Sequence, residues 1–478
     1  MKLSAKKFGS TKFPNDYDVI RTATLNKTDL AGGNNKFYQI EAHVSKDKKS
    51  FRLFSCYGRV GTDGVQEERI PPQNESSLLA AFESLKSEKT GKSKGYVEVK
   101  MAAVKVGSSV ANTKILSDDV KKDKIVVGDD DDKAKARVIM HKTVEKLVDR
   151  LYAEAGQAVQ RQLSGSLKST AENPLGTLTL TQIEHGRSIL GEIHQLLTDK
   201  PNLKGSINAD LVRLSNNFFS AIPQTIPHRP KPSDGQKALD EWLKTIVLND
   251  EKRLDDKEEL MGLLADVQGM VGGFATTEVG KKYKEIGCQY DWLDPKDDIR
   301  KKVEKAMSDN RSSRHDWGID IVNVWSVTVK GQKDKHLATM KNVGNIKPLF
   351  HGSRPANILG ICKHGLLLRP PGAIVTGSMF GNGLYFADQS SKSEQYSFGG
   401  GWGSSYGTDT YFMFVADVAL GKIKEYEDAQ SHLQKAPSGF QSVLGKKGRA
   451  LYHNEYIIYD IEQHILQYLV EFRVRNRR

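Results

Sequence analysis

A histidine, a tyrosine and a glutamate stand in three separate motifs whose residue types could do chemistry together. His351 opens an HGS triplet after an apolar pair, and Tyr385 follows a turn that holds two glycines. Glu455 is the acidic residue in the middle of a β-branched and aromatic stretch, 451–460. A carboxylate can stabilise a developing positive charge and polarise a nucleophile. The three residues are therefore candidates for one catalytic site.

The flanking segments predict the elements that would hold these side chains. The apolar residues before His351 place it at the end of a strand. The Gly-rich turn 381–383 leads into a short strand at 384–387. The serine run at 390–396 can cap and begin a helix. The composition of 451–460 predicts another strand.

Together these motifs resemble the catalytic domain of the poly(ADP-ribose) polymerase family, of diphtheria-toxin type. The resemblance lies in HGSR, in GNGLYFAD followed by SKS and a tyrosine, and in NEYIIYD, in that order. It implies that the family's His-Tyr-Glu triad falls on His351, Tyr385 and Glu455. Each residue alone also has a structural reading, as a strand-end histidine, a core tyrosine or an exposed charge on an edge strand. The three matching flanks together favour the catalytic interpretation.

The resemblance implies that NAD is consumed as a substrate and that no metal is used. Glu455 would stabilise the positive charge left on the ribose when nicotinamide departs, as carboxylates do in glycosidases. The backbone of Gly352 and the hydroxyl of Ser393 would bind the nicotinamide amide, and Tyr385 and Tyr396 would sandwich its ring. The full set of implied NAD-binding residues is His351, Gly352, Ser353, Asn357, Gly383, Tyr385, Lys392, Ser393 and Tyr396. The chain has no GxGxxG after a first strand, which excludes a Rossmann NAD site.

Two positions depart from the family pattern on the adenosine side of this site. Ser378 stands where the family often has an aromatic residue. Leu367 stands where it often has a basic one, and Arg369 is two residues further on as a possible substitute. The segment 438–449 is also shorter than the corresponding loop of large family members.

Composition limits the remaining possibilities. The 478 residues are too many for one core and predict two to four domains. The sequence has no apolar run long enough for a membrane span, and its basic N-terminus lacks the apolar core of a secretory signal. The three cysteines, Cys56, Cys288 and Cys362, form neither a metal-ligand spacing nor a disulfide framework. The net charge is +12.

The basic excess is concentrated near the N-terminus and suggests a nucleic-acid partner. Residues 1–108 hold 19 basic and 12 acidic side chains. Such a module beside an enzyme indicates phosphate binding, although basic surfaces are often merely solvated.

The segment 16–108 resembles the family's WGR module, through YGRVGT at 57–62 and EKTG at 88–91. The resemblance implies DNA binding by Tyr57, Gly58 and Arg59. Tyr57 replaces the usual tryptophan, which is implied to stack at a DNA end, and a tyrosine can still stack with less area. The arginine is implied to contact phosphate or the protein's own regulatory domain. The structural alternative is a strand-turn-strand with a buried tyrosine.

We therefore expect a multidomain α+β protein. Residues 1–15 are a disordered tail, 16–108 a WGR-like module with a small mixed β-sheet, and 109–140 a charged linker. Residues 141–275 read as an all-α bundle, in which Thr181 can cap a helix, and they resemble the regulatory helical domain. That domain is implied to cover the adenosine side of the NAD cleft and to loosen when DNA binds. Residues 276–478 form a mainly antiparallel β ADP-ribosyltransferase domain.

Three functions remain open at this point. The first is a polymerase, stimulated by DNA breaks, that transfers ADP-ribose to proteins and elongates chains. The second is a mono-ADP-ribosyltransferase of the same fold, and the third is a catalytically silent protein that binds DNA ends or ADP-ribose. The expected partners are NAD, DNA strand breaks and protein acceptors, which include the chain itself. We expect no membrane partner, and we expect the protein to be a monomer. We expect a nuclear location in a eukaryote and a cytoplasmic one otherwise, and no secretion.

Overall fold

The computed structural model describes residues 13, 14, 16–69, 72–100, 140–162, 178–274, 276–369, 378–398 and 410–475. The chain divides into two compact units, Met1–Val138 with Gln160–Asp250, and Ile139–Val159 with Glu251–Arg478. The helical region expected at 141–275 therefore contributes to both units. The expected tail, except for residues 13 and 14, and the expected linker, except for residue 140, lie outside the described residues.

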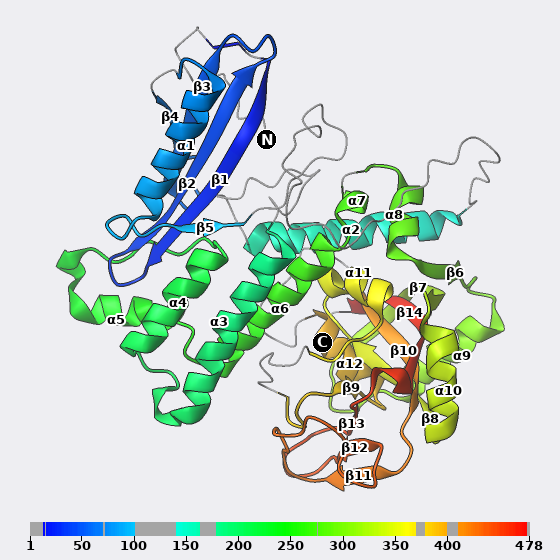
Figure 1. Ribbon diagram of the computed structural model, residues 1–478. Helices are drawn as coiled ribbons and strands as arrows, with labels where there is room; N and C mark the ends of the chain where they lie inside the picture. The colour runs from blue at the N-terminus through cyan, green and yellow to red at the C-terminus, as the bar shows by residue number, and fades with distance from the viewer. Residues whose placement is uncertain are drawn as a thin grey trace. The chain divides into compact units, whose positions relative to one another are not determined.

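The first unit is built on a five-stranded sheet in the order β4-β3-β2-β1-β5 (Figure 1). Its strands are β1 (Tyr17–Asp29), β2 (Asn34–Ser45), β3 (Phe51–Arg59), β4 (Val65–Arg69) and β5 (Val97–Val99). Every pairing described in it is antiparallel, so the expectation of a mixed sheet is corrected in this detail. The reason is that β1 to β4 follow one another through short turns, which reverse the chain direction.

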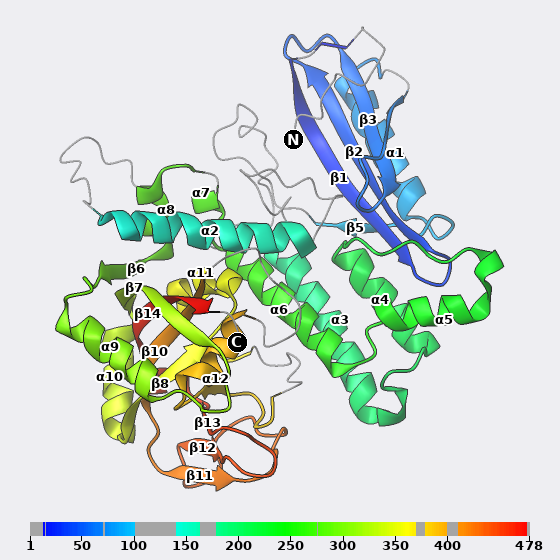
Figure 2. The same ribbon diagram turned by 180° about the vertical axis from the view of Figure 1, so that it is seen from behind.

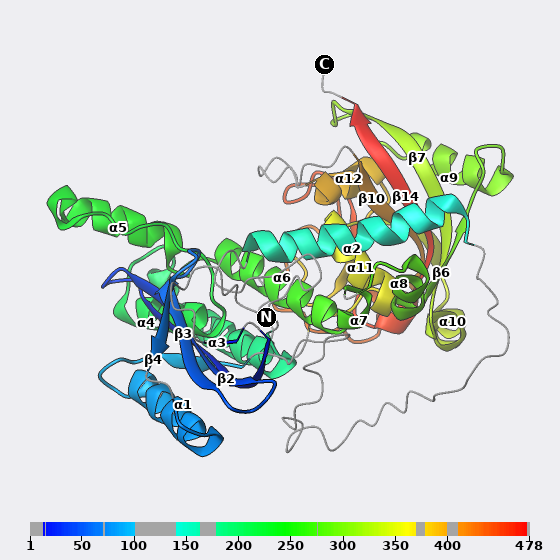
Figure 3. The same cartoon turned by 90° about the horizontal axis from the view of Figure 1, so that it is seen from above.

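Helix α1 (Glu75–Thr90) packs on one face of this sheet (Figure 3). It begins with a capping box, in which the backbone N–H of Ser77 donates to Asn74 Oδ1 at 2.8 Å and the N–H of Asn74 donates to Ser77 Oγ at 3.1 Å. It ends at Gly91, whose N–H donates to the carbonyl of Ser87. Both ends satisfy backbone groups that the helix itself leaves unpaired.

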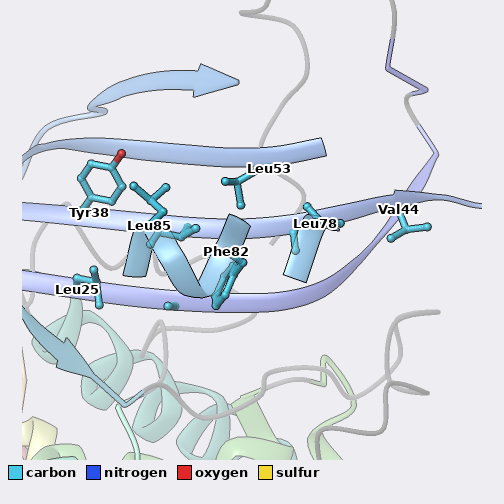
Figure 4. Packing of buried hydrophobic residues seen from close by; sticks show 10 residues of the cluster. Leu25, Tyr38, Val44, Leu53, Leu78, Phe82 and Leu85 are labelled. Carbon is cyan, nitrogen blue, oxygen red and sulfur yellow. The ribbon is translucent and has the colours of Figure 1, made fainter. Parts of the chain in front are cut away.

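The buried face of α1 carries Leu78, Phe82 and Leu85, spaced as one face of a helix requires. These side chains pack against sheet residues that include Leu25 and Leu53 (Figure 4). Full burial of each such side chain contributes about 1.5–3 kcal/mol. The contact holds the sheet and helix together as one module.

Three helices complete the first unit: α3 (Leu180–Asp199), α4 (Ala209–Ala221) and α5 (Gly235–Ile246). Single 3-10 turns lie at Pro201–Leu203 and Pro232–Asp234. Helix α3 is capped by Thr179, whose side chain accepts from the N–H of Gln182 at 3.2 Å. The expected cap at Thr181 was wrong, because the helix begins at Leu180 and Thr181 already lies in its first turn.

Buried hydrogen bonds join α4 to the sheet. The Asn26 side chain on β1 is fully buried and donates to the carbonyl of Phe219 at 2.9 Å. The N–H of Thr28 donates to Ser220 Oγ at 3.0 Å. Unpaired buried polar groups are costly, so these contacts fix the register between strand and helix.

The second unit carries the other helices of the region. They are α2 (Lys142–Gln162), α6 (Glu251–Gln268), α7 (Val271–Phe274) and α8 (Val279–Ile286). Arg150 of α2 donates from Nη2 to the carbonyl of Thr410 at 2.6 Å and forms an ion pair with Glu471 at 2.5 Å. This partly buried network attaches α2 to the strands of the same unit.

Two sheets follow in the second unit, in the orders β6-β7-β14-β10-β8 and β11-β12-β13-β9 (Figure 2). The strands are β6 (Cys288–Trp292), β7 (Gly318–Val329), β8 (Ile346–Gly352), β9 (Leu384–Phe386), β10 (Tyr411–Ala419), β11 (Ile423–Tyr426), β12 (Ser442–Gly445), β13 (Glu455–Ile458) and β14 (His464–Arg475). Among the described pairings only β11 with β12 is parallel, so the expected mainly antiparallel domain is confirmed. Phe350 and Ala387 exchange two hydrogen bonds of 2.9 Å, which connect β8 with the end of β9.

The remaining helices of this unit are α9 (Asp298–Asp309), α10 (Gln332–Val343), α11 (Pro355–His364) and α12 (Ser390–Phe398), with a 3-10 turn at Ile461–Gln463. The strand expected over 451–460 is shorter, because only Glu455–Ile458 pairs. Before it, Asn454 accepts from the N–H of Lys447 and donates to Asp388, both at 2.9 Å. Such side-chain bonds compete with a strand ladder.

No helix in the described ranges combines the length and the apolar character that crossing a lipid bilayer requires.

Candidate active site and nucleic-acid interface

His351 lies near the end of β8, as the sequence predicted. Its Nδ1 lies 2.9 Å from the backbone carbonyl of Tyr385. Because a carbonyl only accepts, Nδ1 carries the proton, and Nε2 of the neutral ring is left as an acceptor. Burial lowers the pKa of His351, which keeps the ring neutral. The imidazole can therefore accept a hydrogen bond from a hydroxyl group.

Gly352 lies where β8 meets α12. A Cβ atom at this position would lie 1.7 Å from the carbonyl oxygen of Ser393. No side chain fits, so the glycine allows strand and helix to approach closely. The same contact brings Lys392 and Ser393 of α12 next to the end of β8. Ser393 is buried, with 3% of its surface exposed.

Tyr385 on β9 is held rigidly through its hydroxyl group. The hydroxyl donates to the carbonyl of Gly381 at 2.9 Å and accepts from the N–H of Phe380 at 3.0 Å. Burial raises the pKa of Tyr385 to about 12, so the phenol stays protonated. With its hydroxyl occupied, Tyr385 can offer a ring face for stacking but no free proton.

Glu455 begins β13 and is buried, with 8% of its surface exposed. Its Oε1 lies 2.5 Å from Nζ of Lys392 on α12. Strand β13 pairs with β9 in a register that sets Ile457 opposite Tyr385. The tyrosine and the glutamate of the predicted triad therefore come from neighbouring strands of one sheet. This excludes the alternative that Glu455 is an exposed surface charge.

The predicted adenosine-side residues lie at the start of α11. Asn357 Nδ2 lies 3.4 Å from Ser353 Oγ and donates to Glu259 Oε1 at 3.0 Å. Arg354 Nη1 is 2.7 Å from Glu259 Oε2. Arg369 is the possible substitute for the basic residue that the family often has at the position of Leu367. It pairs with Asp255 at 3.0 Å. Two carboxylates of α6 thus bind Arg354, Asn357 and Arg369.

The two other residues predicted to bind NAD, Gly383 and Tyr396, lie in different surroundings from each other. Gly383 packs on β13, where a Cβ would lie 2.2 Å from a side-chain carbon of Ile457. Tyr396 is 58% exposed and lies on α12, three residues after Ser393 and four after Lys392. Residues at these spacings share a helix face. The structure records no direct contact between Tyr396 and Tyr385.

Tyr57, expected to contact DNA, lies near the end of β3. Its ring stacks on that of Tyr38 at 5.1 Å between centroids, with the planes 5° apart. Both rings line an open pocket together with four lysines and Tyr96. Tyr57 is partly buried and packs against the hydrophobic core of the module. The setting suits an aromatic platform beside phosphate groups.

Gly58 and Arg59 have structural partners of their own. A Cβ at Gly58 would lie 2.8 Å from the Cα of Gly64, so the turn requires a residue without a side chain. Arg59 Nη2 donates to the carbonyls of Ile226 at 3.0 Å and Pro227 at 3.1 Å. The guanidinium therefore contacts the loop after α4, which matches the second of the two contacts that the resemblance implied for it.

Sequence reasoning missed two groups of residues at these sites. Glu259 and Asp255 carried no local signal, because their partners lie about a hundred residues away. The second group is Tyr38, Lys89 and Tyr96. Their proximity to Tyr57 depends on how β2, β3 and the segment after α1 pack together, which the sequence does not show. The EKTG motif, which contains Lys89, was the one available hint for the second group.

The described residues contain no group of three or more histidine, cysteine or acidic side chains placed to hold a metal ion.

Comparisons with known proteins agree with this arrangement. A family model described as "WGR domain" matches residues 21–103. The model "Poly(ADP-ribose) polymerase, regulatory domain" matches 139–278, and "Poly(ADP-ribose) polymerase catalytic domain" matches 297–451. The last match ends before Glu455.

Several curated proteins are similar over nearly the whole chain. "Poly [ADP-ribose] polymerase 1" of Arabidopsis thaliana is 28% identical over 97% of this chain and 48% of its own length. The protein of that name from Danio rerio is 25% identical over 95% of this chain and 45% of its own. "Poly [ADP-ribose] polymerase 2" of Homo sapiens is 24% identical over 95% of this chain and 79% of its own. The chain spans about half the length of the first two relatives.

A WGR-like sheet, a helical region and a domain of two sheets with a His-Tyr-Glu set define a multidomain protein of the ADP-ribosyltransferase fold class. The three matching models and these relatives show more than the class. The chain belongs to the poly(ADP-ribose) polymerase family.

Proposed function

We propose that the chain is an NAD-dependent protein ADP-ribosyltransferase that elongates poly(ADP-ribose) and is stimulated by DNA breaks. The observation that carries this proposal is the buried Glu455 carboxylate, held by Lys392 beside the strand of Tyr385. Cleavage of the nicotinamide–ribose bond leaves positive charge on the ribose. A fixed, buried carboxylate stabilises such charge better than a solvated one, because it needs no reorganisation. The catalytic residues we propose are Glu455, His351 and Tyr385.

The geometry of the same site supports NAD as the substrate. Nε2 of His351 is an available acceptor for a ribose hydroxyl, and Gly352 keeps side chains away from the place where the nicotinamide amide would bind. The rings of Tyr385 and Tyr396 would stack on the nicotinamide. Gly383 supports the turn before Tyr385, and the hydroxyl of Ser393 would complete the amide contacts. Ser353 and Asn357 would contact the adenosine half.

We further propose that helix α6 restrains the NAD site. Glu259 holds Arg354 and Asn357, and Asp255 holds Arg369. A ligand that needs these groups must first displace the carboxylates. Each tenfold of stimulation needs only about 1.4 kcal/mol of bias between the restrained and released states. Two partly exposed ion pairs, each worth up to about 1 kcal/mol, can together supply a bias of this size.

The DNA-binding role rests on the first unit. The stacked Tyr57 and the surrounding lysines suit a nucleic-acid strand end, and Gly58 shapes the turn that presents them. Arg59 would pass the binding signal to the loop at Ile226 rather than read the DNA itself. Because lysines displace counterions from phosphates, DNA affinity should fall steeply with salt. Affinity that stays constant from low to high salt would argue against this role.

The proposal extends to the module boundaries, the acceptors, the oligomeric state and the cellular location. The module boundaries are 16–108, 141–275 and 276–478, after a tail at 1–15 and a linker at 109–140. Acceptors are proteins including the chain itself, and the protein acts as a monomer. In a eukaryotic cell it would act in the nucleus, in the response to DNA damage.

One assay tests the proposed activity. Purified protein is incubated with labelled NAD, with and without nicked DNA, and the products are resolved on a gel. We expect a ladder of modified protein that strengthens when DNA is added. A single band would indicate mono-ADP-ribosylation, and no labelled protein would indicate a silent binding protein.

A further inference from the structure

Helix α12 carries residues of the proposed NAD site and, on a different face, a buried acid that the site does not use. The residues of the site are Lys392, Ser393 and Tyr396. The acid is Glu394, and side chains one or two positions apart on a helix do not face each other. Glu394 instead shares a face with Ser390 and Ser391, which precede it by four and three residues.

Glu394 is bound through both of its carboxylate oxygens. Its side chain is 0% exposed, and its Oε1 lies 2.5 Å from Nη1 of Arg311, whose side chain is 21% exposed. Its Oε2 accepts from Nε1 of Trp317 at 2.8 Å. Nη2 of Arg311 also donates to the backbone carbonyl of Trp317 at 2.8 Å. The three residues therefore form a closed ring of hydrogen bonds.

The same face of α12 has further bonds to α9 and the segment that follows it. The N–H of Ser390 donates to the carbonyl of Asn310 at 2.9 Å, and its Oγ donates to the carbonyl of Met307 at 2.7 Å. The N–H of Ser312 donates to Ser391 Oγ at 2.8 Å. The placement of α12 therefore depends on this segment.

A buried ion pair is not required merely to attach a helix. The cost of desolvating two charges offsets much of their attraction, and an apolar pair of similar volume is often as stable. What an ion pair adds is direction, because charge-assisted hydrogen bonds fix both the distance and the orientation of their partners. The rotation of α12 about its axis matters here, since Lys392 on another face must reach Glu455.

We propose that the ion pair between Glu394 and Arg311 positions Lys392 on Glu455 and thereby supports ADP-ribose transfer. The inference rests on the proposed transferase function. Both residues act through α12, so they are positioning residues rather than catalytic ones.

Urea unfolding of the full chain tests whether the two ion pairs are coupled. The variants are Glu394→Gln, Lys392→Met and the double variant. Glutamine keeps the size of the side chain and an oxygen for Trp317. If α12 turns when the ion pair is lost, Lys392→Met should cost less than half as much stability in the Glu394→Gln chain as in wild type. Equal costs would show that the two pairs are independent and would overturn the proposal.

Arg311→Lys separates geometry from charge. It keeps both charges of the pair but removes the planar fork that binds Glu394 and Trp317 together. A smaller cost of Lys392→Met in this chain than in wild type therefore comes from the position of α12. A cost equal to that in wild type would show that only the charge of Glu394 matters, and the positioning role would be wrong. This variant also keeps the test open if Glu394→Gln does not fold.

Initial rates with labelled NAD test whether the pair matters for the reaction. In Glu394→Gln, kcat should fall about fivefold or more while KM for NAD stays within about threefold, because the effect is on Glu455. The double variant should be no slower than Lys392→Met alone, since both changes act through the same carboxylate. Arg311→Lys should lie between Glu394→Gln and wild type.

Asp309→Asn is the matched control, because it removes an exposed ion pair with Lys305 on α9. It should keep the wild-type kcat. Values of kcat within about twofold of wild type in folded Glu394→Gln and Arg311→Lys would show that the pair is only structural. A raised KM with an unchanged kcat would likewise overturn the proposal.

The two measurements separate this inference from the proposed function. If the wild-type chain transfers ADP-ribose and its kcat does not depend on Glu394, the function stands and the inference fails. If the wild-type chain transfers no ADP-ribose, the proposed function fails and a role in transfer fails with it. Urea unfolding then still decides whether the ion pair holds Lys392 on Glu455.

Discussion

The ammonium of Lys392 lies 2.5 Å from a carboxylate oxygen of Glu455, and the side chains are only 9% and 11% exposed. The pair joins helix α12 to the first residue of β13. Removing one partner of a buried pair leaves the other charge without compensation. Lys392 therefore has a definite task in this structure, which is to hold the carboxylate in one place.

Replacement of that lysine tests this task. Lys392→Met should lower ADP-ribose transfer by about tenfold or more and destabilise the unit by about 3 kcal/mol, because Glu455 is left as an unpaired buried charge. Lys392→Arg keeps the charge and should recover part of both losses. Initial rates with labelled NAD and urea unfolding are the measurements. Wild-type rates in the methionine variant would show that the pair has no role in catalysis.

A second prediction concerns the restraint by α6. Glu259→Ala removes the carboxylate that binds Arg354 and Asn357. Activity without DNA should then rise by about threefold to fivefold, which corresponds to a partly exposed ion pair worth up to about 1 kcal/mol. Asp256→Ala removes an exposed carboxylate of the same helix and serves as the control. Basal activity is measured before and after adding nicked DNA. Equal basal rates in Glu259→Ala and wild type would exclude this ion pair as a restraint.

Arg59 separates DNA binding from stimulation. Arg59→Ala removes the donors to the carbonyls of Ile226 and Pro227. We expect stimulation by DNA to fall about tenfold, equivalent to about 1.4 kcal/mol, while DNA affinity and its salt dependence stay nearly constant. Arg21→Ala, an exposed arginine on β1, is the matched control. A drop of about one in the salt slope would instead identify Arg59 as a phosphate contact.

His464 predicts how stability depends on pH. It is fully buried at the start of β14, and burial, with His336 and His351 nearby, lowers its pKa to about 3. In the unfolded chain a histidine titrates near pH 6.5. Between these values the unfolded state binds a proton that the folded state does not, so stability is complete above about pH 6.5 and is lost as the pH falls. At pH 5 this one group costs about 2 kcal/mol.

Denaturant unfolding at pH 7 and pH 5 measures this effect. His464→Gln should reduce the difference between the two pH values by about 2 kcal/mol. His432→Gln, at an exposed position, should leave it unchanged. The same pH dependence in wild type and His464→Gln would rule out the assignment.

Local sequence patterns predicted the elements that hold the reacting residues. The strand that ends at Gly352 and the short strand of Tyr385 follow from apolar residues and glycine turns. The helix with Lys392 begins in the serine run as expected, but the hydroxyls of Ser390 and Ser391 bond to Met307 and Ser312 instead of capping it. Glycines were informative because Gly352 and Gly58 stand where backbones come too close for a side chain. Such steric requirements act on individual positions and can be recognised in a motif.

Long-range partners could not be predicted in the same way. The helical region looked like a single bundle, because an apolar helix face does not reveal which surface it will cover. The structure divides its helices, with Arg150 of α2 bound to Glu471 and Asn26 bound to the end of α4. The antiparallel first sheet and the cap at Thr179 likewise depend on geometry that composition does not specify.

The most direct test of the account is Glu455→Gln in the labelled-NAD assay with nicked DNA. The substitution keeps the shape of the side chain but removes the charge, so NAD affinity should stay within about threefold while transfer falls by about a hundredfold or more. Chain elongation should be lost before transfer of the first ADP-ribose unit. The ladder should therefore shorten to a single band before labelled protein disappears. Glu425→Gln, an exposed position on β11, should match wild type. Transfer by Glu455→Gln within about threefold of wild type, a barrier change of only about 0.6 kcal/mol, would contradict the assignment of Glu455 as the catalytic residue.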